Sequence, residues 1–172
     1  TPKPSSAASD VYKRQPIDSF IAVPLLNTCT NPRTVRAPCT IRARHCENGG
    51  GTPVEQRFDT RDGVSLRALR WPRPAVTDGI PMVLVHGLAS NCRLWDGAAR
   101  HLAELGHDVV ALDLRGHGLS DKPDGGYSVP SVAQDVVDVI DSLSRDGHAW
   151  RRPLVIGQSW GGNIVVELAA HH

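Results

Sequence analysis

The 172-residue sequence contains no uninterrupted apolar run of the roughly 18 to 20 residues that a membrane-spanning helix needs. Cysteine is scarce as well: of four cysteines, three precede residue 52 and Cys92 stands alone in the remainder, so no disulfide framework is expected. A zinc site of Cys39, His45 and Cys46 is not expected, because the paired ligand spacing of such sites is missing. The sequence therefore predicts a protein without a metal, a cofactor or a membrane segment.

A strong net charge of either sign is also lacking. The formal net charge is +1, but residues 1–52 carry seven Lys and Arg against three Asp and Glu, whereas residues 53–172 carry twelve against fifteen. The larger part is mildly acidic, which gives no support to nucleic-acid binding through a basic surface. With 40% hydrophobic residues the chain has apolar material for one core. The oligomeric state stays open.

The first 52 residues differ in kind from the rest. Residues 27–52 are rich in Thr, Arg, Pro and Gly and show neither helical nor strand periodicity. Residues 10–15 resemble the in-frame translation of a transposon adapter end used in sequencing libraries. We expect 1–52 to be a disordered or artefactual leader and 53–172 to be the folded part. The apolar stretch at 20–26 is short and interrupted by Pro24, which makes a poor signal peptide and favours a cytoplasmic location.

Strand and helix patterns alternate through the folded part. An Asp62-Gly63 pair between two short strand patterns indicates a β-hairpin. Apolar runs predict further strands that are buried on both faces. Apolar residues spaced three and four positions apart predict helices, and Asp135 is expected on the outer side of the second helix. The order predicts an α/β fold with a mostly parallel sheet. We expect strands at 54–59, 64–71, 81–86, 107–114 and 154–157, and helices at about 92–105, 128–143 and 163–170.

The strongest motif, Gly157-Gln158-Ser159-Trp160-Gly161, follows the last apolar strand and opens the last helix. A nucleophile that projects from such a sharp turn needs unusual backbone angles, and Gly157 and Gly161 remove side chains that would collide there. At the N-terminus of the helix, the amide of Trp160 and the helix dipole can stabilise an oxyanion. An ordinary glycine-bounded turn with an exposed serine is the alternative.

Two further motifs follow the two preceding buried strands. In His86-Gly87-Leu88 the amide of Leu88 can face the nucleophile as a second oxyanion donor, and His86 fits a structural imidazole better than a catalytic base. The loop that starts at Asp113 fits a structural turn held by Asp and Ser side chains, because it lacks a phosphate-binding Gly-Lys-Ser/Thr or a Gly-x-Gly-x-x-Gly before a helix. Its motif residues are Asp113, Arg115, Gly116 and Gly118.

Taken together and in this order, the three motifs resemble those of the α/β-hydrolase superfamily over residues 54–172. The resemblance implies that Ser159 is the nucleophile and that the backbone amides of Leu88 and Trp160 form the oxyanion hole. It places the acidic and histidine partners beyond the nucleophile helix. Along that helix His171 would lie on the order of 18 Å from Ser159, too far for a base. We therefore expect a fold truncated after the nucleophile helix and inactive by itself.

Three functions are open at this point. The first is a serine hydrolase of small ester, lactone or related acyl substrates that works through an acyl-enzyme on Ser159. The second is carbon–carbon bond hydrolysis or cofactor-free peroxidation of carboxylic acids at the same site. The third is a non-catalytic binding module of the same fold. A serine at this position argues against dehalogenase and epoxide hydrolase chemistry, which in related proteins uses Asp.

Overall fold

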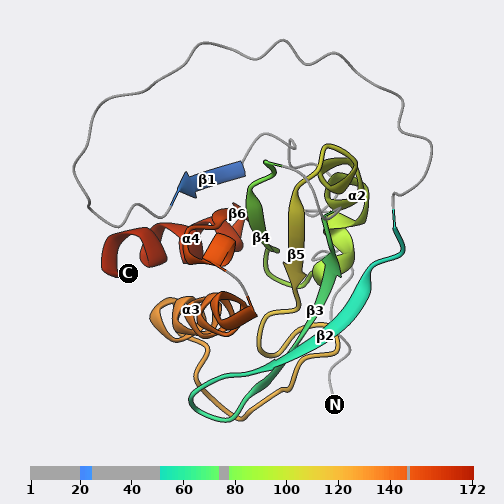
Figure 1. Cartoon of the computed structure of the whole chain (residues 1–172). Helices are drawn as coiled ribbons and strands as arrows, with labels where there is room; N and C mark the ends of the chain where they lie inside the picture. Colours follow the sequence, from blue (N-terminus) through green and yellow to red (C-terminus); the bar gives the residue numbers. More distant parts are fainter. Residues whose placement is uncertain (1–19, 25–50, 74–77, 147) are drawn as a thin grey trace.

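The computed structural model describes residues 20–24, 51–73, 78–146 and 148–172, which form one mixed sheet with helices on both faces (Figure 1). The strand order is β1-β6-β4-β5-β3-β2. β4 pairs in parallel with β5 and β6, and the other pairings are antiparallel. The strands are β1 (Phe20–Pro24), β2 (Val54–Asp59), β3 (Ser65–Trp71), β4 (Pro81–Val85), β5 (Asp108–Leu112) and β6 (Leu154–Gln158).

The hairpin prediction is confirmed by β2 and β3. The two strands pair from Val54 opposite Arg70 to Asp59 opposite Ser65. The turn closes with a hydrogen bond from the Gly63 amide to the Thr60 carbonyl, and Gly63 adopts a φ of +81°, which a glycine tolerates without steric cost. β3 then pairs with β5, so the hairpin extends the sheet beyond the parallel strands.

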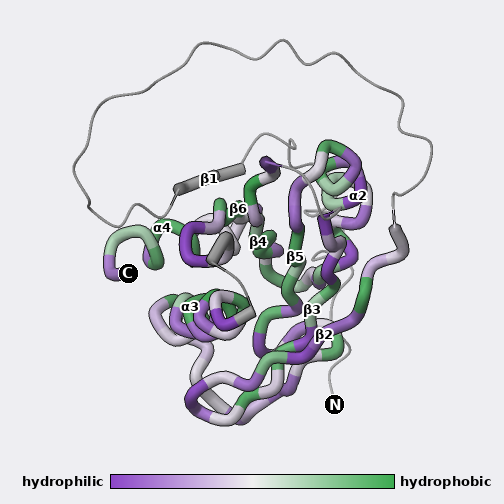
Figure 2. Tube along the Cα trace, in the orientation of Figure 1, coloured by the Kyte–Doolittle hydropathy of each residue, from purple (hydrophilic) through white to green (hydrophobic). Residues whose placement is uncertain are grey.

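Helices cover the two faces of the sheet and divide the core into two layers. The helices are α2 (Asp96–Glu104), α3 (Val129–Asp146) and α4 (Trp160–His171). Because successive residues of a strand point to opposite faces, Val83 packs with α3 and α4, whereas Leu84 packs with α2. Figure 2 shows hydrophobic residues concentrated along the central strands β4 and β5. None of the helices in the described ranges has the length and apolar character required to cross a membrane.

Two helix starts differ from the sequence prediction. The helix predicted from residue 92 begins as a short 3₁₀ turn, Cys92–Trp95, whose N-cap is Asn91: its side-chain oxygen accepts a hydrogen bond from the Arg93 amide at 2.9 Å. The last helix begins at Trp160 rather than at residue 163. Its first turn therefore follows Ser159 directly.

β1 is a strand that the sequence analysis does not expect. It pairs antiparallel with β6, from Phe20 opposite Gln158 to Pro24 opposite Leu154. An edge strand presents unpaired backbone groups, and a short apolar segment can pair with them whatever its distance in sequence. The other leader residues, including 10–15, lie outside the described ranges up to residue 50, so that part of the prediction stays a prediction.

Candidate active site

Ser159 occupies a sharp turn between β6 and α4. Its φ of +54° and ψ of −121° are costly for a residue with a side chain, by about 1–3 kcal/mol. The glycines on either side make this turn possible, because a Cβ on Gly157 would lie 2.3 Å from the Gly161 carbonyl oxygen, and one on Gly161 would lie 2.4 Å from the Val85 carbonyl oxygen. Ser159 is exposed. The local chain thus presents a hydroxyl at the N-terminus of α4.

The His86-Gly87-Leu88 motif lies directly beside this turn. β4 and β6 are parallel neighbours, with Val85 opposite Gly157, so both motifs emerge from the same edge of the sheet. A Cβ on Gly87 would lie 3.0 Å from the Ser159 Cβ. The side chain of Leu88 is 58% exposed. The loop that carries Leu88 therefore begins beside Ser159, and the role of the Leu88 and Trp160 amides as oxyanion donors stays a prediction.

His86 is fully buried at the end of β4. Its Nε2 accepts a hydrogen bond of 3.1 Å from the Leu114 amide, and its Nδ1 lies 2.7 Å from the Gly87 carbonyl oxygen. Burial lowers the pKa of His86 below its usual 6.5, opposed by the bond to Gly87. These contacts fit the structural imidazole that the sequence analysis prefers.

Asp113 joins the loops that follow β4 and β5. Its carboxylate accepts hydrogen bonds from the amides of Cys92 at 2.6 Å and Leu119 at 2.9 Å, and it pairs with Arg67 at 3.3 Å. Burial opposes ionisation, but these hydrogen bonds hold the pKa of Asp113 below 3.8. Gly118 has a φ of +51°, and a Cβ there would meet the carboxylate. The glycine is required by this close approach.

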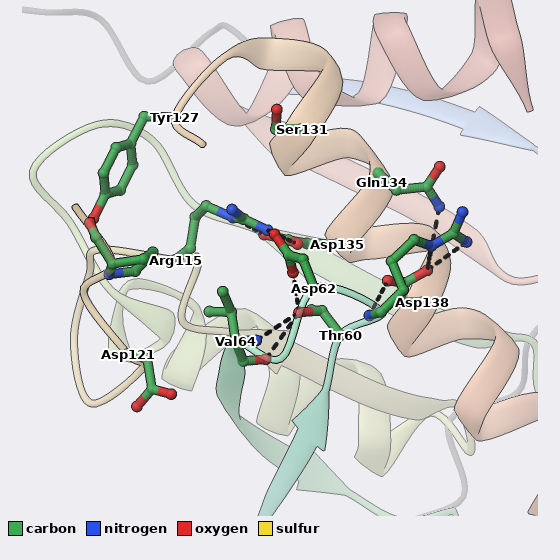
Figure 3. A network of polar contacts seen from close by, with 12 residues as sticks. Thr60, Asp62, Val64, Arg115, Asp121, Tyr127, Ser131, Gln134, Asp135 and Asp138 are labelled. Carbon is green, nitrogen blue, oxygen red and sulfur yellow. Dashed lines mark hydrogen bonds and ion pairs between the residues drawn. The ribbon is translucent and has the colours of Figure 1, made fainter. Parts of the chain in front are cut away.

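Arg115 anchors the same loop to the hairpin and to α3 (Figure 3). Its Nε donates to Asp135 at 2.6 Å and its Nη2 to Asp62 at 2.8 Å. The expectation that Asp135 lies on the outer side of its helix is wrong: the residue is 1% exposed, because the loop covers that helix face and supplies the arginine. Gly116, with φ +79°, leaves room for the ring of Tyr127. The loop is therefore a structural turn held by ion pairs.

Sequence reasoning missed two residues beside the site and one residue beside the Asp113 loop. His117 lies between His86 and Trp160, with ring centroids 5.1 and 6.2 Å away. Gln158 directs its side chain toward Gly87, and its Oε1 is buried without a hydrogen-bond partner. Arg67 on β3 is buried beside Asp113. Gln158 could have been suspected as the neighbour of Ser159, whereas nothing local marks the other two.

The described residues supply no evident base for Ser159. Within 51–73, 78–146 and 148–172, no imidazole or carboxylate is hydrogen-bonded to its hydroxyl. The same part of the chain contains no group of three or more His, Cys, Asp or Glu that could hold a metal ion. The arrangement offers a strained serine, a helix N-terminus and an adjoining loop.

The model of the alpha/beta hydrolase fold family matches residues 80–172. An AB hydrolase superfamily protein of Bacillus subtilis is 30% identical over 119 residues, which cover 68% of this chain and 39% of that protein. A non-heme chloroperoxidase of Streptomyces lividans is 34% identical over 112 residues, which cover 64% of this chain and 37% of that protein. The chain thus spans somewhat more than a third of the length of these relatives.

Solved structures lead to the same fold. An epoxide hydrolase from an endophytic Streptomyces superimposes with a TM-score of 0.59 at 26% identity, over 69% of this chain and 33% of that one. The family match covers more than half of the chain, and the sheet with helices on both faces is of the alpha/beta type that the family name describes. This chain belongs to the alpha/beta hydrolase fold family.

Proposed function

We propose that the complete protein carrying this chain is a hydrolase that uses Ser159 as its nucleophile on small ester, lactone or related acyl substrates. The observation that carries the proposal is the strained Ser159 at the N-terminus of α4, with the Gly87 loop close against it. Strain of this kind persists only where the surrounding structure holds it, and it is common at reacting groups. The names of the similar proteins describe different reactions. The acyl substrate is therefore inferred from the serine nucleophile itself.

The proposed reaction has two stages. The Ser159 hydroxyl attacks the acyl carbonyl and gives its proton to a base, and the negative charge on the carbonyl oxygen is received by the amides of Trp160 and Leu88. Loss of the alcohol leaves an acyl-enzyme, which water hydrolyses to release the acid and restore the serine. The resemblance places the acid and the base after α4. We therefore expect residues 1–172 alone to show no turnover.

The second candidate keeps the same nucleophile. The chloroperoxidase relative favours cofactor-free peroxidation of carboxylic acids, in which hydrogen peroxide instead of water takes the acyl group from Ser159. Carbon–carbon bond hydrolysis and a non-catalytic binding module remain the further alternatives. A cytoplasmic location and small molecules, rather than nucleic acids, as partners are proposals from the sequence.

The test is covalent labelling of the complete protein by a fluorophosphonate, with Ser159→Ala as the control. The proposal expects labelling of the wild type at Ser159 and none in the variant. Turnover of p-nitrophenyl acetate and of short lactones then separates the acyl hydrolase from a peroxidase, which would need hydrogen peroxide and a carboxylic acid. An unlabelled wild type that still binds small acyl compounds would indicate the binding module.

A further inference from the structure

His117 is held in the loop that follows β5 by hydrogen bonds of its own backbone. Its amide donates to the Leu114 carbonyl at 2.9 Å, and its carbonyl accepts a hydrogen bond from the Ser120 amide at 3.1 Å. The residues on either side, Gly116 and Gly118, have φ values of +79° and +51°. The loop therefore turns sharply on both sides of a single imidazole, whose backbone has a fixed place.

The ring of His117 lies close to residues that adjoin the proposed nucleophile. Its centroid is 5.1 Å from that of the His86 ring and 6.2 Å from that of the Trp160 ring. Trp160 directly follows Ser159. His86 directly precedes Gly87, and a Cβ on Gly87 would lie 3.0 Å from the Ser159 Cβ. The imidazole of His117 is thus bordered on two sides by neighbours of Ser159.

One nitrogen of this ring is engaged and the other is free. Nδ1 lies 3.0 Å from the Arg115 carbonyl oxygen, which can only accept, so Nδ1 carries a proton. Within the part of the chain that the structure describes, Nε2 has no hydrogen-bond partner, and it does not belong to the buried side-chain atoms that lack one. Nε2 is therefore open to solvent, and in the neutral ring it is an acceptor that still needs a donor.

The open nitrogen lies at the edge of the sheet where a ligand would bind. His86, on one side of the ring, is fully buried, whereas His117 itself is half-buried, so its ring is accessible from another side. The loop of His117 follows the carboxyl end of β5, which is parallel to β4. Ligands of open α/β sheets bind beyond the carboxyl ends of the parallel strands. An acyl group on Ser159 would occupy this same edge.

We propose that His117 contacts the acyl substrate and that its Nε2 accepts a hydrogen bond from a hydroxyl group on the acyl chain. The inference rests on the proposed function, and it narrows the substrates to hydroxyacyl compounds, since a hydroxyl is the smallest donor that satisfies this acceptor. His117 makes and breaks no bond in the reaction. It determines specificity, because an acyl chain without a donor leaves Nε2 unpaired once water is displaced.

The experiment compares esters that differ only by a hydroxyl on the acyl chain. The complete protein is assayed on methyl lactate against methyl propanoate, and on methyl β-hydroxybutyrate against methyl butyrate. The quantity measured is the ratio of the two kcat/KM values within each pair. Comparison of this ratio between variants cancels the intrinsic reactivity of the esters.

Three variants separate the acceptor from the ring. His117→Phe keeps an aromatic ring without the acceptor, so the ratio for at least one pair should fall about three- to tenfold, the usual effect of one neutral hydrogen bond. His117→Gln can place its amide oxygen near the position of Nε2 and should retain most of the ratio. His101→Phe is the matched control and should leave both ratios unchanged, because the His101 side chain is 72% exposed on α2, across the sheet from α4.

Nitrogen NMR provides a second measurement that does not depend on the folding of His117→Phe. In Ser159→Ala, which keeps the esters intact, the hydroxy esters should shift the signal of His117 Nε2, and their unsubstituted partners should not. Equal ratios in the wild type and His117→Phe, a loss in His117→Gln as large as in His117→Phe, or an Nε2 signal that does not respond to the hydroxyl would each overturn the inference.

Failure of the proposed function looks different. The wild type would then hydrolyse none of the four esters, or its turnover would survive in Ser159→Ala, and both the proposed function and this inference would be overturned. A wild type that is active through Ser159, with ratios that do not depend on His117, overturns this inference alone.

Discussion

The α carbon of Gly161 lies against the carbonyl oxygen of Val85, so that a Cβ on Gly161 would stand 2.4 Å from that oxygen. The first turn of α4 therefore crosses the end of β4 with no space for a side chain. Gly161→Ala should lower the free energy of unfolding by about 1–3 kcal/mol, because backbone rather than a flexible side chain must move. Urea denaturation measures this loss.

Gly97 in α2 is the matched control, because it also lies in a helix but has open space where a Cβ would be. Gly97→Ala should raise the free energy of unfolding by about 0.5–1 kcal/mol, through the higher helix propensity of alanine. Equal effects of the two substitutions would contradict the close packing of α4 on β4.

The Ser159→Ala variant should be less stable than the Ser159→Gly variant. Alanine keeps the Cβ that makes a φ of +54° costly, whereas glycine adopts such angles freely. Relief of about 1–3 kcal/mol of strain is partly offset by the greater freedom of glycine in the unfolded chain. We therefore expect the free energy of unfolding of Ser159→Gly to be about 1 kcal/mol higher than that of Ser159→Ala. Chemical denaturation of both variants provides the comparison. A more stable alanine variant would argue against a strained turn.

Much of the fold could be predicted because its signals are local. Apolar runs mark the buried strands, and the Gly157 and Gly161 spacing marks the sharp turn, since the backbone angles at Ser159 depend on its immediate neighbours. The positions of His86 and Gly87 beside the turn follow from the parallel pairing of β4 and β6. Local pattern and chain order together thus place the candidate site.

The missed features depend on contacts between distant segments. Asp135 looks solvent-facing from helix periodicity, and only the loop carrying Arg115, 20 residues earlier, buries it. The pairing of β1 with β6 joins residues 20–24 to 154–158, which no local pattern specifies. Arg67 lies between Leu66 and Ala68 in β3, and its partner Asp113 directly follows β5.

The Arg115 ion pairs should contribute strongly to stability. Arg115 and Asp135 are both nearly fully buried, and removal of one member of such a pair leaves an uncompensated charge. Arg115→Met should cost about 3–5 kcal/mol of unfolding free energy. The ion pair of Arg61 with Asp138 is the control, because the Arg61 side chain is 61% exposed. Arg61→Met should cost much less unfolding free energy than Arg115→Met, because water screens the exposed guanidinium, and similar losses in thermal or chemical unfolding would contradict the difference in burial.

The stability of the fold should decrease in acid partly through His86. Burial lowers the pKa of His86, so below its usual value of 6.5 the unfolded chain binds a proton that the folded chain resists. The contribution is therefore complete above about pH 6.5 and is lost as the pH falls, with a slope of up to about 1.4 kcal/mol per pH unit. His86→Asn lacks this group but keeps His117, whose ring lies 5.1 Å from that of His86. Urea unfolding of both proteins should show the stability advantage of the wild type shrinking between about pH 8 and pH 5.5. An advantage that stays constant or grows toward acid would mean that His86 accepts a proton in the folded protein.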